Sequence, residues 1–255
     1  AGVAGYGSLA IEVVLGIFML LFGINFSVYH LIMLRKFKEA FCMEEVKVYL
    51  SIVFLSTLAI MFNIAKMAGG FGHALRQSFF QVASIITTTG FATVDFELWP
   101  EFSKHILVLL MIIGACAGST GGGMKISRVI ILAKSFVAEI RQIINPKEII
   151  TVRLNDAVVD KKTLDSTRIY VAAYMILLCL FTLVISLDGL DFTTNFTAVI
   201  SCFNNIGPGL AGVGPMANFS VYSDWAQVVL SAAMLTGRLE IFPMLLLFAR
   251  SAHDR

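Results

Sequence analysis

Charged residues are scarce in this chain. Only 14% of its 255 residues are charged and 58% are hydrophobic, and the mean hydropathy is +0.84. A water-soluble domain has about a quarter of its residues charged, because its surface faces water. The composition therefore predicts that much of the surface faces lipid or other membrane-embedded protein. The formal net charge of +2, with no basic stripe interleaved with aromatics, argues against a nucleic-acid partner.

Paired cysteines are also missing. The four cysteines lie singly in or beside apolar stretches, at positions Cys42, Cys116, Cys179 and Cys202. Their spacing fits neither a zinc site nor a disulfide framework, so we interpret them as small packing residues. The chain begins with Ala1 and Gly2 and shows no basic segment typical of a signal peptide, so we expect processing or truncation.

Lysine and arginine are absent from residues 169–237, although nine of them lie within residues 125–168 and four within residues 35–47. Cytoplasmic loops of membrane proteins carry an excess of basic residues. This asymmetry predicts that residues 35–47 and 134–168 are cytoplasmic. It places the acidic residues Asp188, Asp191 and Asp224 toward the outer face.

Apolar stretches recur along the chain. Five are about long enough to cross a bilayer, at residues 9–34, 46–65, 103–133, 169–187 and 222–249. Two shorter ones, at 74–87 and 193–204, end in irregular tails, TTTGF at 87–91 and NNIGPGL at 204–210. Irregular backbone at membrane depth is tolerated only where protein or water surrounds it, so these segments are predicted to be re-entrant pore loops.

The two predicted pore loops align with each other at an offset of 117 residues. Four of twelve positions match, pairing Phe79 with Phe196, Val82 with Val199, Ser84 with Ser201, and Gly90 with Gly207. Both loops lie between two spans, which favours an internal repeat. The predicted fold is an all-α integral membrane protein with one leading span and two span–pore loop–span units.

Such loops suit the chemistry of a dehydrated potassium ion. Rings of backbone carbonyls can replace its water shell, and several loops must surround one axis. Turning successive carbonyls toward the axis favours glycine, which fits Gly90 after Thr88 and Thr89, and Gly207 after Asn205 and Ile206. The C-terminal ends of the short helices would also favour a cation. The alternative is an ordinary turn in a packed hairpin.

A run of small residues, CAGSTGGGMKIS, occupies positions 116–127 within the third long stretch. Each glycine costs a helix up to about 1 kcal/mol relative to alanine, so the span is expected to break into two halves joined by a mobile loop. A close helix-packing motif is the alternative. A nucleotide-binding P-loop is excluded, because Met124 stands where lysine is required and the flanking residues are apolar.

Two further charged features lie at membrane depth or near it. Arg238, in the sequence GRLE, is costly inside a bilayer and is expected to point inward, toward carbonyls or hydroxyls of the glycine-rich loop or toward Glu240. A snorkelling arginine at a helix end is the alternative. The cluster Asp95, Glu97 and Glu101 follows the first tail and is either a solvated loop or a means of attracting cations.

Four segments together carry a resemblance to a known family. They are SFFQVASIITTTGFATVDFELWP, GACAGSTGGGMKISR, FNNIGPGL and LTGRLEIFPMLLLF. In this order and spacing they resemble the Trk/Ktr/HKT potassium transporter superfamily, and its Trk-type pore subunit in particular. Along the chain the resemblance implies the last helix of a preceding repeat at 1–45, a third repeat at 46–145, a cytoplasmic linker at 146–168 and a fourth repeat at 169–255.

The resemblance also implies roles for individual residues. Potassium, as the transported ion, would meet a filter whose glycines are Gly90 and Gly207, with oxygens from Thr88, Thr89, Asn205 and Ile206. Arg238 would stabilise an intramembrane gating loop. The residues of that loop would be Gly118, Ser119, Thr120, Gly121, Gly122 and Gly123.

Family members work as homodimers in the bacterial inner membrane, under a cytoplasmic nucleotide-binding ring protein that would bind near residues 141–168. No cofactor is expected in the chain. The first two of four repeats are not in this sequence, so it is expected to be the C-terminal half of a subunit, either a fragment or one part of a split subunit.

Three other functions are weighed against potassium transport. Some relatives are sodium-permeable or sodium-coupled, although glycine at both filter positions favours potassium. A membrane enzyme using Ser119 or His105 is disfavoured, because no base, nucleophile and orienting group converge in the sequence. A non-conducting scaffold or fragment would have no need for unusual backbone at membrane depth.

Overall fold

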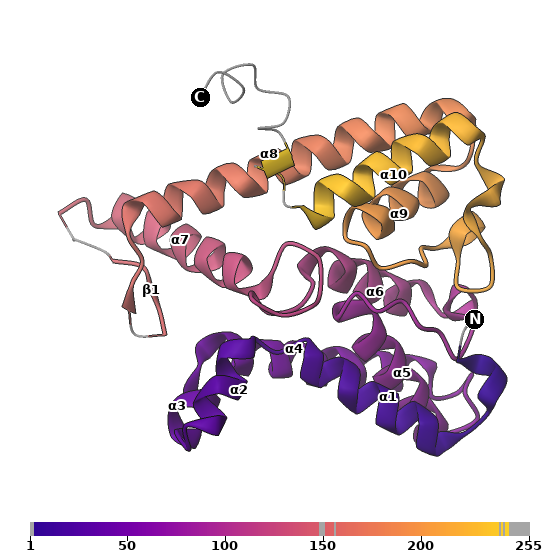
Figure 1. The fold of residues 1–255 in the computed structure, drawn as a ribbon, viewed down its shortest axis with the longest axis horizontal. Helices are drawn as coiled ribbons and strands as arrows, with labels where there is room; N and C mark the ends of the chain where they lie inside the picture. Colours follow the sequence, from indigo (N-terminus) through magenta and orange to yellow (C-terminus); the bar gives the residue numbers. More distant parts are fainter. Residues whose placement is uncertain (1–2, 148–150, 156, 240, 242, 245–255) are drawn as a thin grey trace.

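The computed structural model describes residues 3–147, 151–155, 157–239, 241 and 243–244. Helices dominate it, and the chain forms the all-α arrangement that the sequence predicts (Figure 1). Three parts follow one another along the chain. We call them the leading segment (residues 3–43), the first unit (44–144) and the second unit (161–238).

The leading segment contains α1 (Leu9–Phe22), α2 (Phe26–Met33) and α3 (Phe37–Cys42). The apolar stretch predicted over residues 9–34 is long enough to cross a membrane only as a bent pair, because α1 and α2 meet at 91°. Gly23 ends α1, and the Asn25 side chain starts α2 by accepting a hydrogen bond from the Ser27 N–H at 2.9 Å. A side chain on Gly23 would collide with the Tyr49 hydroxyl, so the bend packs closely against α4.

The first unit contains α4 (Glu44–Ile64), α5 (Phe71–Ile86), α6 (Glu101–Ile113) and α7 (Ile126–Ile144). The short helix α5 packs mainly against α4, with further contacts to α1 and α6. Residues 114–125, between α6 and α7, are not helical. We call this segment the glycine loop, and Figure 1 shows it in the middle of the molecule, between the two units.

The second unit contains α8 (Lys161–Ile185), α9 (Phe192–Phe203) and α10 (Asp224–Arg238). Helix α8 begins 117 residues after α4 begins, and α9 ends 117 residues after α5 ends. The predicted linker over 146–168 is not all linker. It holds a short antiparallel hairpin, β1 (Arg153–Leu154) and β2 (Ala157–Val158), and the first turns of α8.

Uninterrupted spans are fewer than the hydropathy pattern predicts. Among the described residues, two helices are long and apolar enough to cross a membrane, Glu44–Ile64 and Lys161–Asp188, or three if the bent pair α1 and α2 counts as one. The stretch 103–133 is split by the glycine loop. In the stretch 222–249, helix α10 ends at Arg238 and the described residues 241, 243 and 244 are helical again, while residues 240, 242 and 245–249 lie outside the described part of the chain.

The pore helices α5 and α9 supply the centre of the core. Their last turns are buried on every side, from Val82 to Ile86 and from Ala198 to Phe203. Long apolar side chains on α1 and α8, such as Phe18 and Leu183, are instead more than half exposed. This is the distribution expected when lipid, rather than water, surrounds the outer helices.

Candidate functional site: the two tails and the glycine loop

The two tails, residues 87–91 and 204–210, share an unusual backbone. The φ angle is positive at Thr88 (54°) and Gly90 (77°) in the first tail, and at Asn205 (55°) and Gly207 (117°) in the second. These are the same positions at an offset of 117 residues. Glycine reaches this region freely and asparagine tolerates it, but a β-branched threonine there is strained. Sequence reasoning expected the two glycines and missed the left-handed Thr88 and Asn205.

Equivalent hydrogen bonds hold the two tails. The Thr89 N–H donates to the Ser84 carbonyl and the Ile206 N–H donates to the Ser201 carbonyl, both at 2.9 Å. Both serines are fully buried, and the Ser201 hydroxyl also accepts from the Gly207 N–H at 3.1 Å. The match of Ser84 with Ser201 in the sequence alignment therefore marks a pair of side chains at corresponding places beneath the tails.

The tails lie against each other. A side chain at Gly90 would collide with the Ile206 carbonyl oxygen and would lie 3.1 Å from the Pro208 ring. At Gly207, by contrast, no described atom lies within 4 Å of the position a side chain would take. The structure therefore brings the predicted filter residues of both tails together, and glycine at position 90 is required by close approach as well as by its φ angle.

The glycine loop packs beneath both tails. The Gly122 N–H donates to the Thr88 hydroxyl oxygen at 2.7 Å, which holds the strained threonine. A side chain at Gly122 would collide with the Asn204 carbonyl oxygen. The predicted gating residues 118–123 thus lie directly against the predicted filter residues. The loop can come this close only because the residue at the contact, Gly122, has no side chain.

The first half of the glycine loop is bound to the bend between α1 and α2. The Cys116 N–H donates to the Gly23 carbonyl at 3.1 Å, and the Phe26 N–H donates to the Gly118 carbonyl at 3.0 Å. The carbonyls at the end of a helix lack partners within it. The bend in the leading segment therefore exposes backbone groups that the loop satisfies.

One buried acid in this region was missed by sequence reasoning. The Glu45 side chain, in the first turn of α4, accepts from the Ala117 N–H of the glycine loop at 2.6 Å. An acidic residue in a first helical turn is common, because it suits the helix dipole. The sequence therefore offered no signal that Glu45 contacts a loop 72 residues away.

Arg238 contacts the glycine loop at Thr120, past the residues that bind the bend and Glu45. Its guanidinium donates to the Thr120 carbonyl at 3.2 Å, and Lys125 donates to the Gly121 carbonyl. Helix α10 ends at Arg238, but the described residues 241, 243 and 244 are helical again, so the placement of Arg238 inside the last span stays a prediction. Its other predicted partner, Glu240, lies outside the described residues.

A cavity of about 310 Å³ opens between the loop and these cations. Its lining consists of Ser119, Thr120, Gly121, Gly122, Gly123, Lys125, Arg128, Tyr170, Gly237 and Arg238. Arg128 stacks on the Tyr170 ring, with its guanidinium carbon 3.9 Å from the ring centre. The space below the glycine loop is therefore lined by basic side chains.

The acidic cluster after the first tail, Asp95, Glu97 and Glu101, forms ion pairs and hydrogen bonds within the protein. Glu97 forms an ion pair with Lys104 at 3.2 Å and accepts from the Ala211 N–H of the second unit at 2.7 Å. Asp95 accepts from the Glu97 N–H at 3.1 Å, and Glu101 also pairs with Lys104 at 2.7 Å. These contacts favour a structural role that ties the two units together.

Helix α9 begins at a carboxylate cap, Asp191. Asp191 accepts from the Thr194 hydroxyl at 2.5 Å and from the Thr194 N–H at 3.0 Å. These bonds, the hydroxyl first, hold the pKa of the Asp191 carboxyl below its ordinary value. The Thr194 hydroxyl in turn accepts from the Gly212 N–H at 3.0 Å, so the cap also fixes the segment between α9 and α10.

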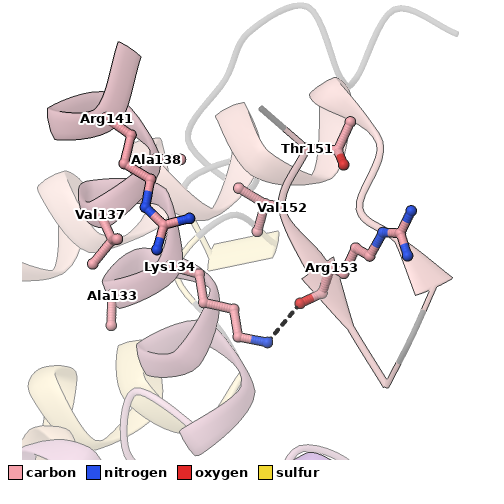
Figure 2. Close-up of a pocket in the computed structure, with 8 residues that line it drawn as sticks. All are labelled: Ala133, Lys134, Val137, Ala138, Arg141, Thr151, Val152 and Arg153. Atoms are coloured by element: carbon pink, nitrogen blue, oxygen red, sulfur yellow. Dashed lines mark hydrogen bonds between the residues drawn. The ribbon is translucent and has the colours of Figure 1, made fainter. Parts of the chain in front are cut away.

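A larger cavity, of about 430 Å³, lies between α7 and the hairpin, away from the tails (Figure 2). Lys134 reaches across it to the Arg153 carbonyl at 2.8 Å, and also pairs with Glu44 at 2.6 Å. Its lining, as far as the described residues go, contains no predicted filter or gating residue. This cavity is therefore separate from the two tails and the glycine loop.

The two residues weighed for catalysis, Ser119 and His105, contact backbone carbonyls three or four residues earlier in the chain. The Ser119 hydroxyl donates to the Cys116 carbonyl at 2.6 Å, and His105 Nδ1 lies 2.7 Å from the Glu101 carbonyl. Neither bond joins a nucleophile to a base. Within the described residues, no cluster of three or more metal-binding side chains is present either.

Comparisons with known proteins agree on one family. Residues 3–254 match the model of the TrkH family, described as cation transport proteins. The chain is 32% identical over 254 residues to the Trk system potassium uptake protein TrkH of Escherichia coli strain K12, covering 97% of this chain and 52% of that protein. It is 31% identical to TrkG of the same strain, covering 96% and 50%.

A solved structure is similar over nearly the whole chain. The potassium transporter TrkH from Vibrio parahaemolyticus superposes with a TM-score of 0.89 at 30% identity, covering 98% of this chain and 54% of that one. The chain thus spans about half the length of the relatives it matches. The relatives are named as transport proteins, not enzymes. This chain belongs to the TrkH family of cation transport proteins.

Proposed function

We propose that this chain forms half of the ion path of a potassium uptake transporter. One observation carries the proposal: two tails with the same left-handed backbone positions lie against each other at the C-terminal ends of two buried short helices. The relatives named as potassium uptake proteins support the choice of ion. Residues 46–145 and 169–255 are then the third and fourth of four repeats.

In this mechanism the tails act as a selectivity filter. A potassium ion loses its water and is held by carbonyl oxygens, including those of Thr88, Thr89, Asn205 and Ile206. Helices α5 and α9 direct the negative ends of their dipoles toward the ion. The last turns of both helices are buried, so the field is weakly screened there.

The glycine loop serves as the gate in this proposal. It lies beneath both tails, where an ion leaving the filter must pass. Arg238 stabilises the blocking position through its bond to Thr120. The basic lining of the cavity below the loop would further oppose a cation while the loop is closed.

Family membership also supports a proposal for the assembly. Two repeats supply two sides of a filter, so the other repeats must complete the ring around the ion. The relatives are named as parts of a Trk system. We propose a homodimer in the bacterial inner membrane with a cytoplasmic nucleotide-binding ring protein as its regulator.

Flux measurements test the proposal. Potassium and sodium uptake is measured in proteoliposomes that contain either this chain alone or the product of its complete gene. We expect potassium uptake from the complete product, with sodium uptake at least about tenfold slower. Comparable uptake of both ions would favour a sodium-permeable transporter. Uptake of neither ion, with the regulatory partner present, would contradict transport.

A further inference from the structure

Glu45 is the acidic side chain on which three separate elements converge. Only 3% of the residue is exposed. Its Oε1 atom accepts from the Ala117 N–H at 2.6 Å and from the Ser127 N–H at 3.2 Å. Its Oε2 atom lies 3.4 Å from the amide nitrogen of Asn25. The carboxylate thus contacts the glycine loop, the start of α7 and the bend between α1 and α2.

The bond to Ser127 replaces a missing helix cap. Helix α7 begins at Ile126, and its N-cap residue, Lys125, provides no side-chain acceptor. The first N–H groups of a helix lack partners within it and attract negative charge. Glu45 reaches from α4 to fill this role. The loop residue Ala117 shares the same carboxylate oxygen, so the start of the loop and the start of α7 are held to one point.

A buried carboxylate is stable only while such donors surround it. Removing hydrogen-bond donors from a buried charge is costly, and removing the carboxylate leaves buried N–H groups unsatisfied. The glycine loop and the start of α7 therefore cannot move away from the tails unless the bonds from Ala117 and Ser127 to Glu45 break. Glu45 lies in the first turn of α4, so its backbone need not move with the loop.

We propose that Glu45 is a positioning residue that latches the glycine loop in its closed position beneath the filter. This inference rests on the proposed gating function of the loop. Opening requires the Ala117 and Ser127 N–H groups to leave the carboxylate. The resting flux of the transporter is then set by how strongly position 45 accepts these two hydrogen bonds.

The neighbouring residue provides a matched control. Glu44 is in the same helical turn and carries the same charge, but it pairs with Lys134 and is one third exposed. The corresponding position to Glu45 in the second unit, 117 residues later, is Lys162, so that unit has no equivalent acid. Substitutions at positions 44 and 45 remove one negative charge from adjacent positions in the first turn of α4. They differ in that only Glu45 contacts the glycine loop.

Two readouts test the latch in the complete gene product. The first is potassium flux into proteoliposomes, with the potassium-to-sodium ratio. The second is the rate at which a thiol reagent modifies Ser119→Cys, in a background where the exposed Cys42 and Cys179 are replaced by serine. The variants are Glu45→Ala, Glu45→Gln and Glu44→Gln.

We expect Glu45→Ala to raise both flux and thiol reactivity about tenfold, because two bonds to a charged acceptor are lost. Glu45→Gln keeps the shape and a weaker acceptor, so we expect about a threefold rise. Glu44→Gln should match the parent, and the ion ratio should not change in any variant. If Glu45→Ala does not fold, the comparison of the two glutamine variants decides alone.

The outcomes separate the latch from the transport proposal. Equal values for Glu45→Gln and Glu44→Gln, or reduced flux with unchanged thiol reactivity, would overturn the latch while transport stands. If no variant and no parent protein conducts, transport fails. The ranking of thiol reactivity would then still support or contradict the latch by itself.

Discussion

The first and second units carry almost the same tail on different second helices. Both tails have left-handed backbone at the same two positions, and in each tail a backbone N–H donates to the carbonyl of a buried serine. After the tail, however, α6 stops at Ile113 and the glycine loop packs against both tails, whereas α10 continues without a break to Arg238. The repeated part suits ion selection, which needs equivalent oxygens around an axis. The part that differs suits gating, which needs one mobile element.

The start of the pore helices differs too. Helix α9 has the Asp191 cap, whereas the N-cap residue of α5 is Gly70, which has no side chain to serve as a cap. Helix α5 is instead supported by an ion pair from the leading segment, in which Arg76 contacts Glu12 through two bonds of 2.5 and 2.7 Å. The two pore helices are therefore fixed by different means, a local cap for α9 and a long-range ion pair for α5, and the equivalence of the two tails does not depend on identical surroundings.

The largest expected effect tests whether the two filter glycines are equivalent. Gly90→Ser should reduce the potassium-to-sodium flux ratio by about tenfold or more, because a side chain there collides with the Ile206 carbonyl and φ is positive. Gly207→Ser should reduce the ratio less, since it meets no described atom and bears only the backbone strain. Gly69→Ser, at an open position with φ of 78°, is the control for strain alone. An unchanged ratio in Gly90→Ser would contradict the filter assignment.

The next effect concerns the element that only the first unit has. Deleting residues 121–123 should raise potassium flux by about tenfold, at least as much as Glu45→Ala, because the loop could no longer reach the Thr88 hydroxyl and the tails. Flux is measured in proteoliposomes, with folding followed by size-exclusion chromatography. Unchanged or reduced flux in folded protein would count against a gate.

A smaller effect is expected where the second unit contacts the loop. Arg238→Ala removes one bond to the Thr120 carbonyl, at a site that is not buried, so we expect a rise in flux of about threefold. Arg238→Lys should lie between the alanine variant and the parent. A larger effect than that of the loop deletion would mean that Arg238 acts elsewhere in the path.

The smallest effect sharpens the difference between the capped and uncapped pore helices. Asp191→Ala should lower the free energy of unfolding by about 1 kcal/mol at pH 7, the usual contribution of a cap. The Thr194 bonds lower the pKa of Asp191 in the folded protein below its ordinary value of 3.8. Its ionised form therefore stabilises the fold above that value, and this part is lost as pH falls further.

Comparison with Asp191→Asn isolates the charge, because asparagine keeps an acceptor for the cap. The difference in thermal stability between the parent and this variant should be constant from pH 7 to about pH 5 and should shrink below pH 4. A difference that grows on acidification would contradict the direction of the pKa shift.

Several features were accessible from the sequence because they are local. The scarcity of charge predicts a membrane protein, and the short apolar stretches before TTTGF and NNIGPGL correspond to α5 and α9 within a few residues. Glycines 121–123 predict a helix break, and the structure has no helix between Ile113 and Ile126. Each of these depends on composition or propensity within a short window.

Other features depend on contacts between distant segments. Hydropathy could not reveal the bend at Gly23, because the apolar stretch is continuous and the bend is stabilised by packing against Tyr49 and the glycine loop. It also could not show that α10 ends at Arg238. Glu45 looked like an ordinary first-turn acid, and the left-handed Thr88 contradicts its own local preference.

The sequence by itself determined the membrane setting, the two pore loops and the place of the glycine loop, because hydrophobicity and glycine content act on nearby backbone. Only the tertiary structure decided that the two tails touch, that the loop lies beneath them, and that Glu45 and Arg238 bind that loop. Those contacts arise when buried N–H and carbonyl groups must find partners within the protein, and the partners they find are far away in the chain.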